Sequence, residues 1–134
     1  MSAAAAMPPL LVLQLAVAAV WFYEGFWCKL LAKSAHEFEV VGEVKFVAPA
    51  TAHALLRLLG VAETALAAWV LSGWQPVAAA VVQTALLVGL NSAGIYFSRQ
   101  RIPDPTGMVI KNAAFLVLAW VTAAAALRAA GGSA

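Results

Sequence analysis

Four long apolar stretches, separated by short polar connections, dominate the pattern of hydrophobic and polar residues. They cover approximately residues 9–32, 50–72, 75–98 and 107–129. An α-helix rises about 1.5 Å per residue, so each stretch is long enough to cross a hydrocarbon core about 30 Å thick. We therefore predict an all-α fold, a four-helix transmembrane bundle, in which residues 1–134 form a single integral membrane domain.

The composition supports this class of protein and argues against several others. Of the 134 residues, 64% are hydrophobic and 10% are charged, which is more apolar surface than a soluble domain of this size can bury. Cys28 is the only cysteine, so the chain cannot form an internal disulfide or a two-thiol relay by itself. The histidines and the thiol show no metal-ligand spacing, and the basic residues show no nucleic-acid-binding pattern, so we expect neither partner.

The longest polar segment joins the first two apolar stretches. Within it, Ser34 and Glu37 have the spacing of a capping box, and apolar residues then recur at three-residue intervals. This pattern predicts a short interfacial helix over about residues 35–46, which we interpret as a lid over one end of the bundle. Basic residues gather in and beside the first and third connections, so the positive-inside rule predicts that both connections are cytoplasmic and both termini face outward.

Ionisable residues inside the apolar stretches are the main indication of function. Glu24 lies in the first stretch, Arg57 and Glu63 lie in the second, and Lys111 lies in the fourth. A charge within a membrane span costs several kcal/mol unless it is paired, protonated or in contact with a cavity. Such a residue therefore marks a functional site by default.

The depth of these residues along their helices suggests that they meet. Counted at about 1.5 Å per residue from the expected cytoplasmic end, Glu24, Arg57, Asn91 and Asn112 lie about 7 to 12 Å deep, with Lys111 beside Asn112. Polar groups in lipid need partners within the protein. We therefore expect these side chains to face one another in one polar layer.

A second polar layer is expected nearer the midplane, formed by Glu63 and Gln83, with Gln14 further out. In the second helix, Arg57 and Gly60 share the face that we expect to point into the bundle. Small residues such as Gly60 permit close approach of helices or leave room for a ligand.

Two interpretations of the polar layers remain open. In the structural one, Glu24 and Arg57 form a buried ion pair that fixes the register of the helices. In the functional one, two carboxylates transfer protons, and aromatic rings beside them contact a flat apolar ligand. The candidate catalytic residues are Glu24 and Glu63, and the candidate ligand-binding residues are Trp21, Tyr23, Arg57, Asn91, Lys111 and Asn112.

Several short motifs span most of the chain. They are the run from Trp21 to Gly25 with Lys29 following, the run from Gly60 to Glu63, and Asp104-Pro105 with Gly107 and Lys111-Asn112. In these motifs the chain resembles the DoxX-like family of small four-helix bacterial membrane proteins. One departure is Cys28, which stands where a proline commonly precedes the lysine.

The resemblance implies a four-helix bundle in the bacterial cytoplasmic membrane, with Glu24, Lys29, Glu63 and Lys111 at the positions that match the family pattern. The family takes its name from a subunit associated with thiosulfate:quinone oxidoreduction. Quinone chemistry is thus implied for this chain only by analogy.

Our leading hypothesis is a protein that binds a small lipophilic molecule, a quinone or an isoprenoid, through Glu24 and Arg57, and serves as a membrane redox accessory. The alternative is a small membrane enzyme in which Glu24 or Glu63 acts as general acid or base in isomerising or cyclising an apolar substrate. A further alternative is a proton-coupled transporter. Replacing Glu24 by Gln should preserve binding in the first case, abolish turnover in the second, and uncouple flux from pH in the third. The cofactor, and the choice between a homo-oligomer and a membrane redox partner, stay open.

Overall fold

The computed structural model describes residues 8–30, 49–98 and 102–132. The described residues are almost entirely helical, and none of them lies in a β-strand. The predicted all-α fold with four long helices is therefore confirmed. The interfacial helix predicted at residues 35–46 lies outside the described residues.

The first long helix changes its hydrogen-bonding pattern partway along. It begins as the α-helix α1 (Leu10–Phe22) and continues as the π-helix η2 (Tyr23–Leu30). The π-helix differs from the α-helix because its backbone bonds join residues five apart rather than four. The remaining helices are α3 (Pro49–Ser72), α4 (Pro76–Ser98) and α5 (Pro105–Gly132).

The four long helices have the length and composition of membrane spans. Large apolar side chains remain exposed along their outward faces, as expected for a surface that contacts hydrocarbon rather than water. The segments that are long and apolar enough to cross a membrane are Leu10–Leu30, His53–Ser72, Pro76–Tyr96 and Pro105–Gly131.

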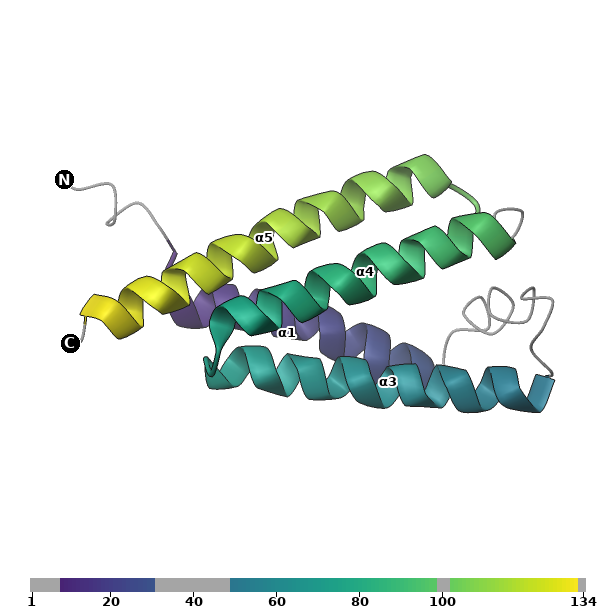
Figure 1. The fold of residues 1–134 in the computed structure, drawn as a ribbon, viewed down its shortest axis with the longest axis horizontal. Helices are drawn as coiled ribbons and strands as arrows, with labels where there is room; N and C mark the ends of the chain where they lie inside the picture. The colour runs from purple at the N-terminus through teal and green to yellow at the C-terminus, as the bar shows by residue number, and fades with distance from the viewer. Residues whose placement is uncertain (1–7, 31–48, 99–101, 133–134) are drawn as a thin grey trace.

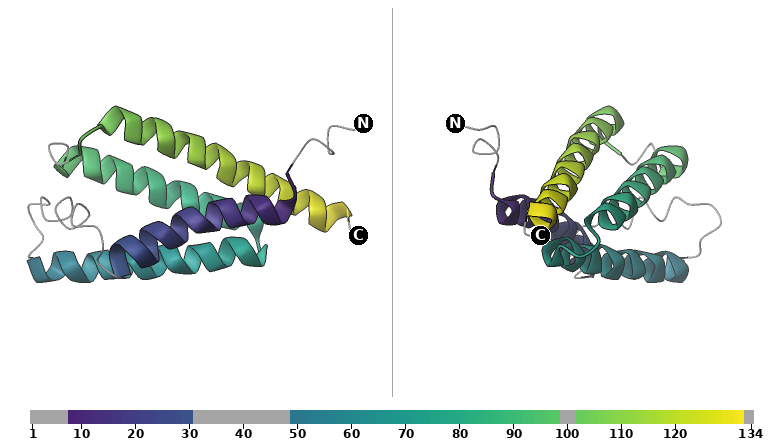
Figure 2. Two further views of the ribbon diagram at one scale, coloured as in Figure 1. Left: turned by 180° about the vertical axis from the view of Figure 1, so that it is seen from behind. Right: turned by 60° about the vertical axis from the view of Figure 1, so that its left-hand side comes forward.

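The helices are arranged as two pairs. The continuous helix α1 and η2 packs along α3, and α4 packs along α5. Figures 1 and 2 show that the two pairs converge at the end where α3 turns into α4, and diverge toward the end where α4 connects to α5. A polar layer to which all four helices contribute therefore has to form across diverging pairs.

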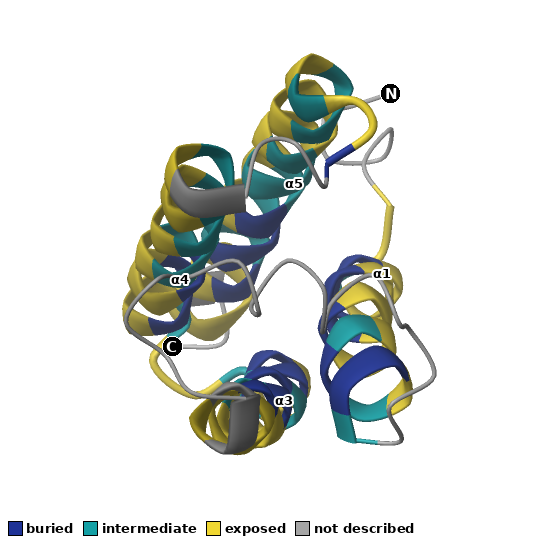
Figure 3. Cartoon of the chain, turned by 90° about the vertical axis from the view of Figure 1, so that its right-hand side faces the viewer, coloured by how far each residue is buried: buried dark blue, intermediate teal, exposed yellow. Residues whose placement is uncertain are grey.

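The hydrophobic core joins α1 to α3 and is covered by side chains of α4 and α5. The ring of Trp21 on α1 meets the ring of Phe115 on α5 edge-on, with centroids 5.6 Å apart. Figure 3 shows the buried residues of α1 and α3 on the sides that face each other. The buried core residues are Val17, Ala18, Trp21, Leu66, Ala67 and Val70.

The connections that flank α4 use residues that end and begin helices. Gly73 adopts a positive φ of 71° in the turn after α3, a conformation that glycine reaches without steric cost. Prolines stand at the first position of α4 and of α5, where a missing backbone N–H removes no helical hydrogen bond. The Asp104 side chain accepts a hydrogen bond from the Gly107 backbone N–H at 3.0 Å, so it caps α5.

Candidate functional site

Two glycines bring η2 and α3 into backbone contact. A Cβ atom added at Gly25 would lie 2.7 Å from the Gly60 carbonyl oxygen and 2.8 Å from the Glu63 Cβ atom. A Cβ atom added at Gly60 would lie 2.9 Å from the Gly25 carbonyl oxygen. All three distances are shorter than a real Cβ atom tolerates. The two helices therefore approach this closely only because Gly25 and Gly60 lack a side chain.

A buried ion pair lies directly beside this contact. The Lys29 Nζ atom on η2 donates a hydrogen bond to the Glu63 Oε2 atom on α3 at 3.1 Å. The Lys29 side chain is 6% exposed and the Glu63 side chain is 1% exposed. A hydrogen bond between charged groups is stronger than one between neutral groups, and it offsets part of the cost of removing two charges from water.

Glu24 supplies a second carboxylate on the other side of the same ammonium group. Its Oε2 atom lies 3.8 Å from the Lys29 Nζ atom, and its backbone carbonyl accepts a hydrogen bond from that nitrogen at 3.3 Å. The Glu24 side chain is 41% exposed, in contrast to that of Glu63. Glu24 and Lys29 are five residues apart, the spacing that the hydrogen bonds of a π-helix join.

These three residues, Glu24, Lys29 and Glu63, are called the ion-pair site below. The site offers an enclosed pair of opposite charges and a carboxylate that remains accessible at the surface of the bundle. Chemically, such a set can hold a polar group of a ligand or exchange a proton with one, because a carboxylate accepts hydrogen bonds when ionised and donates when protonated.

The predicted ion pair between Glu24 and Arg57 does not form, and Lys29 is the cation that Glu24 and Glu63 face. Arg57 is exposed, while the preceding residue, Leu56, is fully buried. Neighbouring residues on an α-helix point about 100° apart. The inward face of α3 includes Leu56, Gly60 and Glu63, so Gly60 faces into the bundle as predicted, whereas Arg57 does not.

The asparagines of the predicted layer meet each other instead of the carboxylates. The Asn112 Nδ2 atom on α5 donates to the Asn91 Oδ1 atom on α4 at 2.8 Å. Asn91 in turn donates to the Leu87 carbonyl at 2.7 Å. Lys111 is exposed. The single layer predicted from depth is divided in this way between the two helix pairs, because the pairs diverge at this end of the molecule.

The two aromatic candidates have different surroundings. Trp21 is buried, and its Nε1 atom donates a hydrogen bond to the Gln83 Oε1 atom at 2.9 Å. Tyr23 is exposed on the surface of the bundle. Phe22 and Phe26 stack on each other with ring centroids 5.0 Å apart. Trp21 therefore belongs to the core, and Tyr23 is the candidate aromatic residue that a molecule in the membrane can reach.

Lys29 is the residue that reasoning from charge and depth missed. It was counted with the cationic residues of the first connection, because it stands near the end of an apolar stretch. The signal that locates it is the motif in which Tyr23, Glu24 and Gly25 precede the lysine, together with the paired glycines. Among the described residues, no group of three or more His, Cys, Asp or Glu is placed to hold a metal ion.

The fold and the site define a multi-pass helical membrane protein with a buried intramembrane ion pair. Comparison with known families identifies the family within this class of protein. The family model described as the DoxX-like family matches residues 18–120, and the chain belongs to this family. The matched region contains the whole ion-pair site. Neither the comparison with curated proteins nor that with solved structures gave a match.

Proposed function

We propose that the protein binds a small lipophilic molecule with a polar head group, of the quinone or isoprenoid type, at the ion-pair site. The observation that carries the proposal is the unequal burial of the two carboxylates around one lysine. Glu63 is enclosed with Lys29, whereas 41% of the Glu24 side chain is exposed beside them. A pair that only fixed helix register would have no need of a second, accessible carboxylate within a membrane span, where each charge is costly.

Each residue of the site has a distinct part in this proposal. Glu24 contacts the polar head group, because it is the accessible member. Lys29 holds the Glu24 backbone and side chain in place, and Glu63 anchors Lys29 at 3.1 Å. The exposed ring of Tyr23, next to Glu24 in the chain, offers an apolar surface for the rest of the molecule. A protein with such a site would serve as a membrane redox accessory or carrier.

A second candidate is a membrane enzyme that uses Glu24 as general acid or base on an apolar substrate. The same unequal burial favours it, because two carboxylates in different environments are the usual arrangement when one of them exchanges protons with a substrate. Glu63 is too enclosed to contact a substrate directly. In this candidate its part is to position Lys29.

Identification of the lipophilic molecules that co-purify with the protein tests the proposal. The protein is extracted in two unrelated detergents, and the organic extract is quantified by mass spectrometry. Wild-type protein should carry one compound with a polar head group at near-stoichiometric amount. Glu24→Gln, which keeps the shape and an acceptor oxygen, should retain it, and Glu24→Ala should lose most of it.

Asp104→Asn is the matched control, since it changes a carboxylate to an amide at the α5 cap, outside the ion-pair site. It should retain the compound at the wild-type amount. An extract with no enriched compound in either detergent, or equal amounts in wild type and Glu24→Ala, would contradict the binding proposal. A compound that Glu24→Gln retains but converts at a much lower rate would favour the enzyme candidate.

A further inference from the structure

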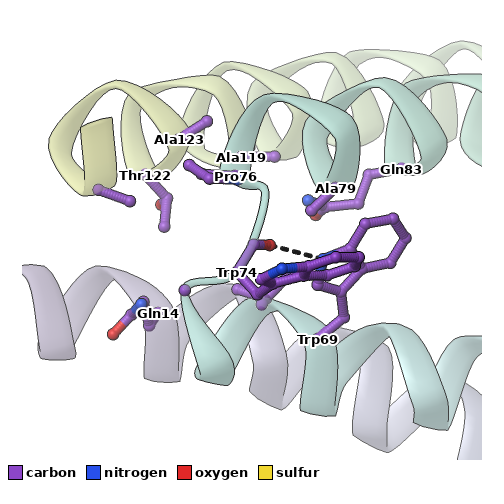
Figure 4. Close-up of a pocket in the computed structure, with 12 residues that line it drawn as sticks. Gln14, Trp69, Trp74, Pro76, Ala79, Gln83, Ala119, Thr122 and Ala123 are labelled. Atoms are coloured by element: carbon purple, nitrogen blue, oxygen red, sulfur yellow. Dashed lines mark hydrogen bonds between the residues drawn. The ribbon is translucent and has the colours of Figure 1, made fainter. Parts of the chain in front are cut away.

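A pocket separate from the ion-pair site lies where the two helix pairs converge, beside the turn from α3 to α4 (Figure 4). Its enclosed part is small and has room for a single small group such as a carbonyl, and the rest of its volume of about 280 Å³ opens to the surroundings. Two indole rings, Trp69 and Trp74, line one side, and small residues of α4 and α5 line the other. No charged side chain of the described residues lines it.

The orientation of the Gln83 amide in this pocket is fixed by a tryptophan. The Trp21 Nε1 atom is a hydrogen-bond donor only, so the atom of Gln83 that it meets at 2.9 Å must be the carbonyl oxygen. The Gln83 NH₂ group therefore faces away from Trp21. The Gln83 side chain reaches into the pocket, and the residue is 2% exposed.

The NH₂ group of Gln83 and the amide of Gln14 have no hydrogen-bond partner within the described part of the chain. Every fully enclosed side-chain nitrogen and oxygen of the described residues does have a partner. The unpaired amide groups must therefore adjoin open space, and the pocket is the open space that both residues line. Gln14 is only 8% exposed, so little of its side chain can contact the surroundings.

We propose that this pocket binds an uncharged molecule through its carbonyl oxygen, which accepts a hydrogen bond from the NH₂ group of Gln83. Unpaired amide donors in an apolar environment are costly, and a carbonyl oxygen satisfies them. An anion is disfavoured because the pocket offers no charged partner among the described residues. The apolar body of the molecule packs against Trp69 and Trp74. Such a carbonyl comes either from the ester group of a bilayer lipid or from a free lipophilic compound.

Photolabelling with benzophenone tests the proposal, because this probe is an uncharged aromatic ketone that crosslinks to nearby C–H bonds on illumination. The full chain is placed in vesicles of ether-linked phosphatidylcholine, whose chains carry no ester carbonyl. Crosslinked peptides should come from the turn between α3 and α4, around Trp69 and Trp74. Gln83→Met should raise the probe concentration for half-maximal labelling about fivefold, the effect of one lost hydrogen bond.

Matched variants keep the outcome interpretable. Gln14 makes no hydrogen bond to the described residues, so Gln14→Met removes none from the fold. Gln83→Met also removes the acceptor for Trp21, so Trp21→Phe, which loses the same hydrogen bond but keeps the Gln83 amide, should label like wild type. Gln14→Met is the matched control, because it makes the same change at the other end of the pocket, and its labelling should equal that of wild type.

Vesicles of ester-linked phosphatidylcholine separate the two sources of the carbonyl. Weaker labelling in these vesicles would assign the pocket to a lipid ester, and unchanged labelling would assign it to a free compound. Equal labelling of wild type and Gln83→Met, or labelling confined to other helices, would overturn the proposal. That result would leave the proposal for the ion-pair site untouched, because Gln14 and Gln83 lie outside that site.

Discussion

The two helix pairs of this protein are held together by different kinds of contact. The pair of α1 and η2 with α3 combines backbone contact at Gly25 and Gly60 with the buried ion pair of Lys29 and Glu63. The pair of α4 with α5 is joined by uncharged side-chain hydrogen bonds, such as that between the two asparagines at 2.8 Å. Apolar burial gives little net attraction between helices in lipid, so these specific contacts decide how each pair is held.

The two pairs differ in the energetic cost of the contacts that hold them. Uncharged hydrogen bonds between membrane helices are common and modest contributors to stability. A buried lysine and glutamate, in contrast, require close geometry and lose much of their gain to desolvation. The first pair therefore bears a cost that packing alone does not explain, and for this reason we assign the function to it.

Breaking the ion pair should give the largest effect and would test this distinction most directly. Glu63→Leu leaves the Lys29 ammonium enclosed, with Glu24 at 3.8 Å as a more distant carboxylate. Loss of one partner of a buried pair should reduce the free energy of unfolding by about 3 kcal/mol. Unfolding of the purified protein in mixed micelles with increasing denaturing detergent measures the change.

The double variant Lys29→Met with Glu63→Leu is the control for this prediction. Replacing both members by apolar residues of similar size should restore most of the lost stability, because no unpaired charge remains enclosed between η2 and α3 and the Glu24 side chain is 41% exposed. A double variant as unstable as Glu63→Leu would show that the loss came from altered packing rather than from an unpaired charge.

The glycine contact should give the next largest effect. Gly25→Ala places a methyl group against the backbone of α3, and neither backbone can move aside without separating the helices. Overpacking of this kind should reduce the free energy of unfolding by about 2 kcal/mol. Gly89→Ala on α4 is the matched control, because nothing lies within 4 Å of the added methyl group. Equal effects of the two variants in the same unfolding measurement would remove the distinction between the helix pairs.

The fold followed from the sequence because it depends on one strong signal. Four apolar stretches of sufficient length predict four membrane helices whatever their detailed packing. The site depends on finer properties. Depth along a helix is nearly fixed by residue number, but the direction in which a side chain points changes by about 100° with each residue. Arg57 was therefore predicted to face inward, although the inward residue is its neighbour Leu56.

Two further features of the ion-pair site cannot be predicted from the periodicity of apolar residues. The π-helix from Tyr23 to Leu30 alters the spacing at which residues share a face, and nothing in the α-helical pattern indicates it. The divergence of the helix pairs separates Asn91 and Asn112 from Glu24, since equal depth places residues together only when helices run nearly parallel. The family motif did include Lys29. A motif identifies residues that occur together in the sequence, so it does not depend on predicting where each side chain points.

Removal of the asparagine pair should give the smallest effect. Asn112→Leu removes the hydrogen bond to Asn91, which then keeps its own bond to the Leu87 carbonyl through Nδ2. Side-chain hydrogen bonds between membrane helices contribute about 0.6 kcal/mol on average, so the free energy of unfolding should fall by about that amount. Asn91→Leu combined with Asn112→Leu should cost little more, because one bond joins the two side chains. Asn112→Leu could instead prove as destabilising as Glu63→Leu. The pair of α4 and α5 would then also contain a polar contact of high energetic cost, and the assignment of function to the pair of α1 and η2 with α3 alone would fail.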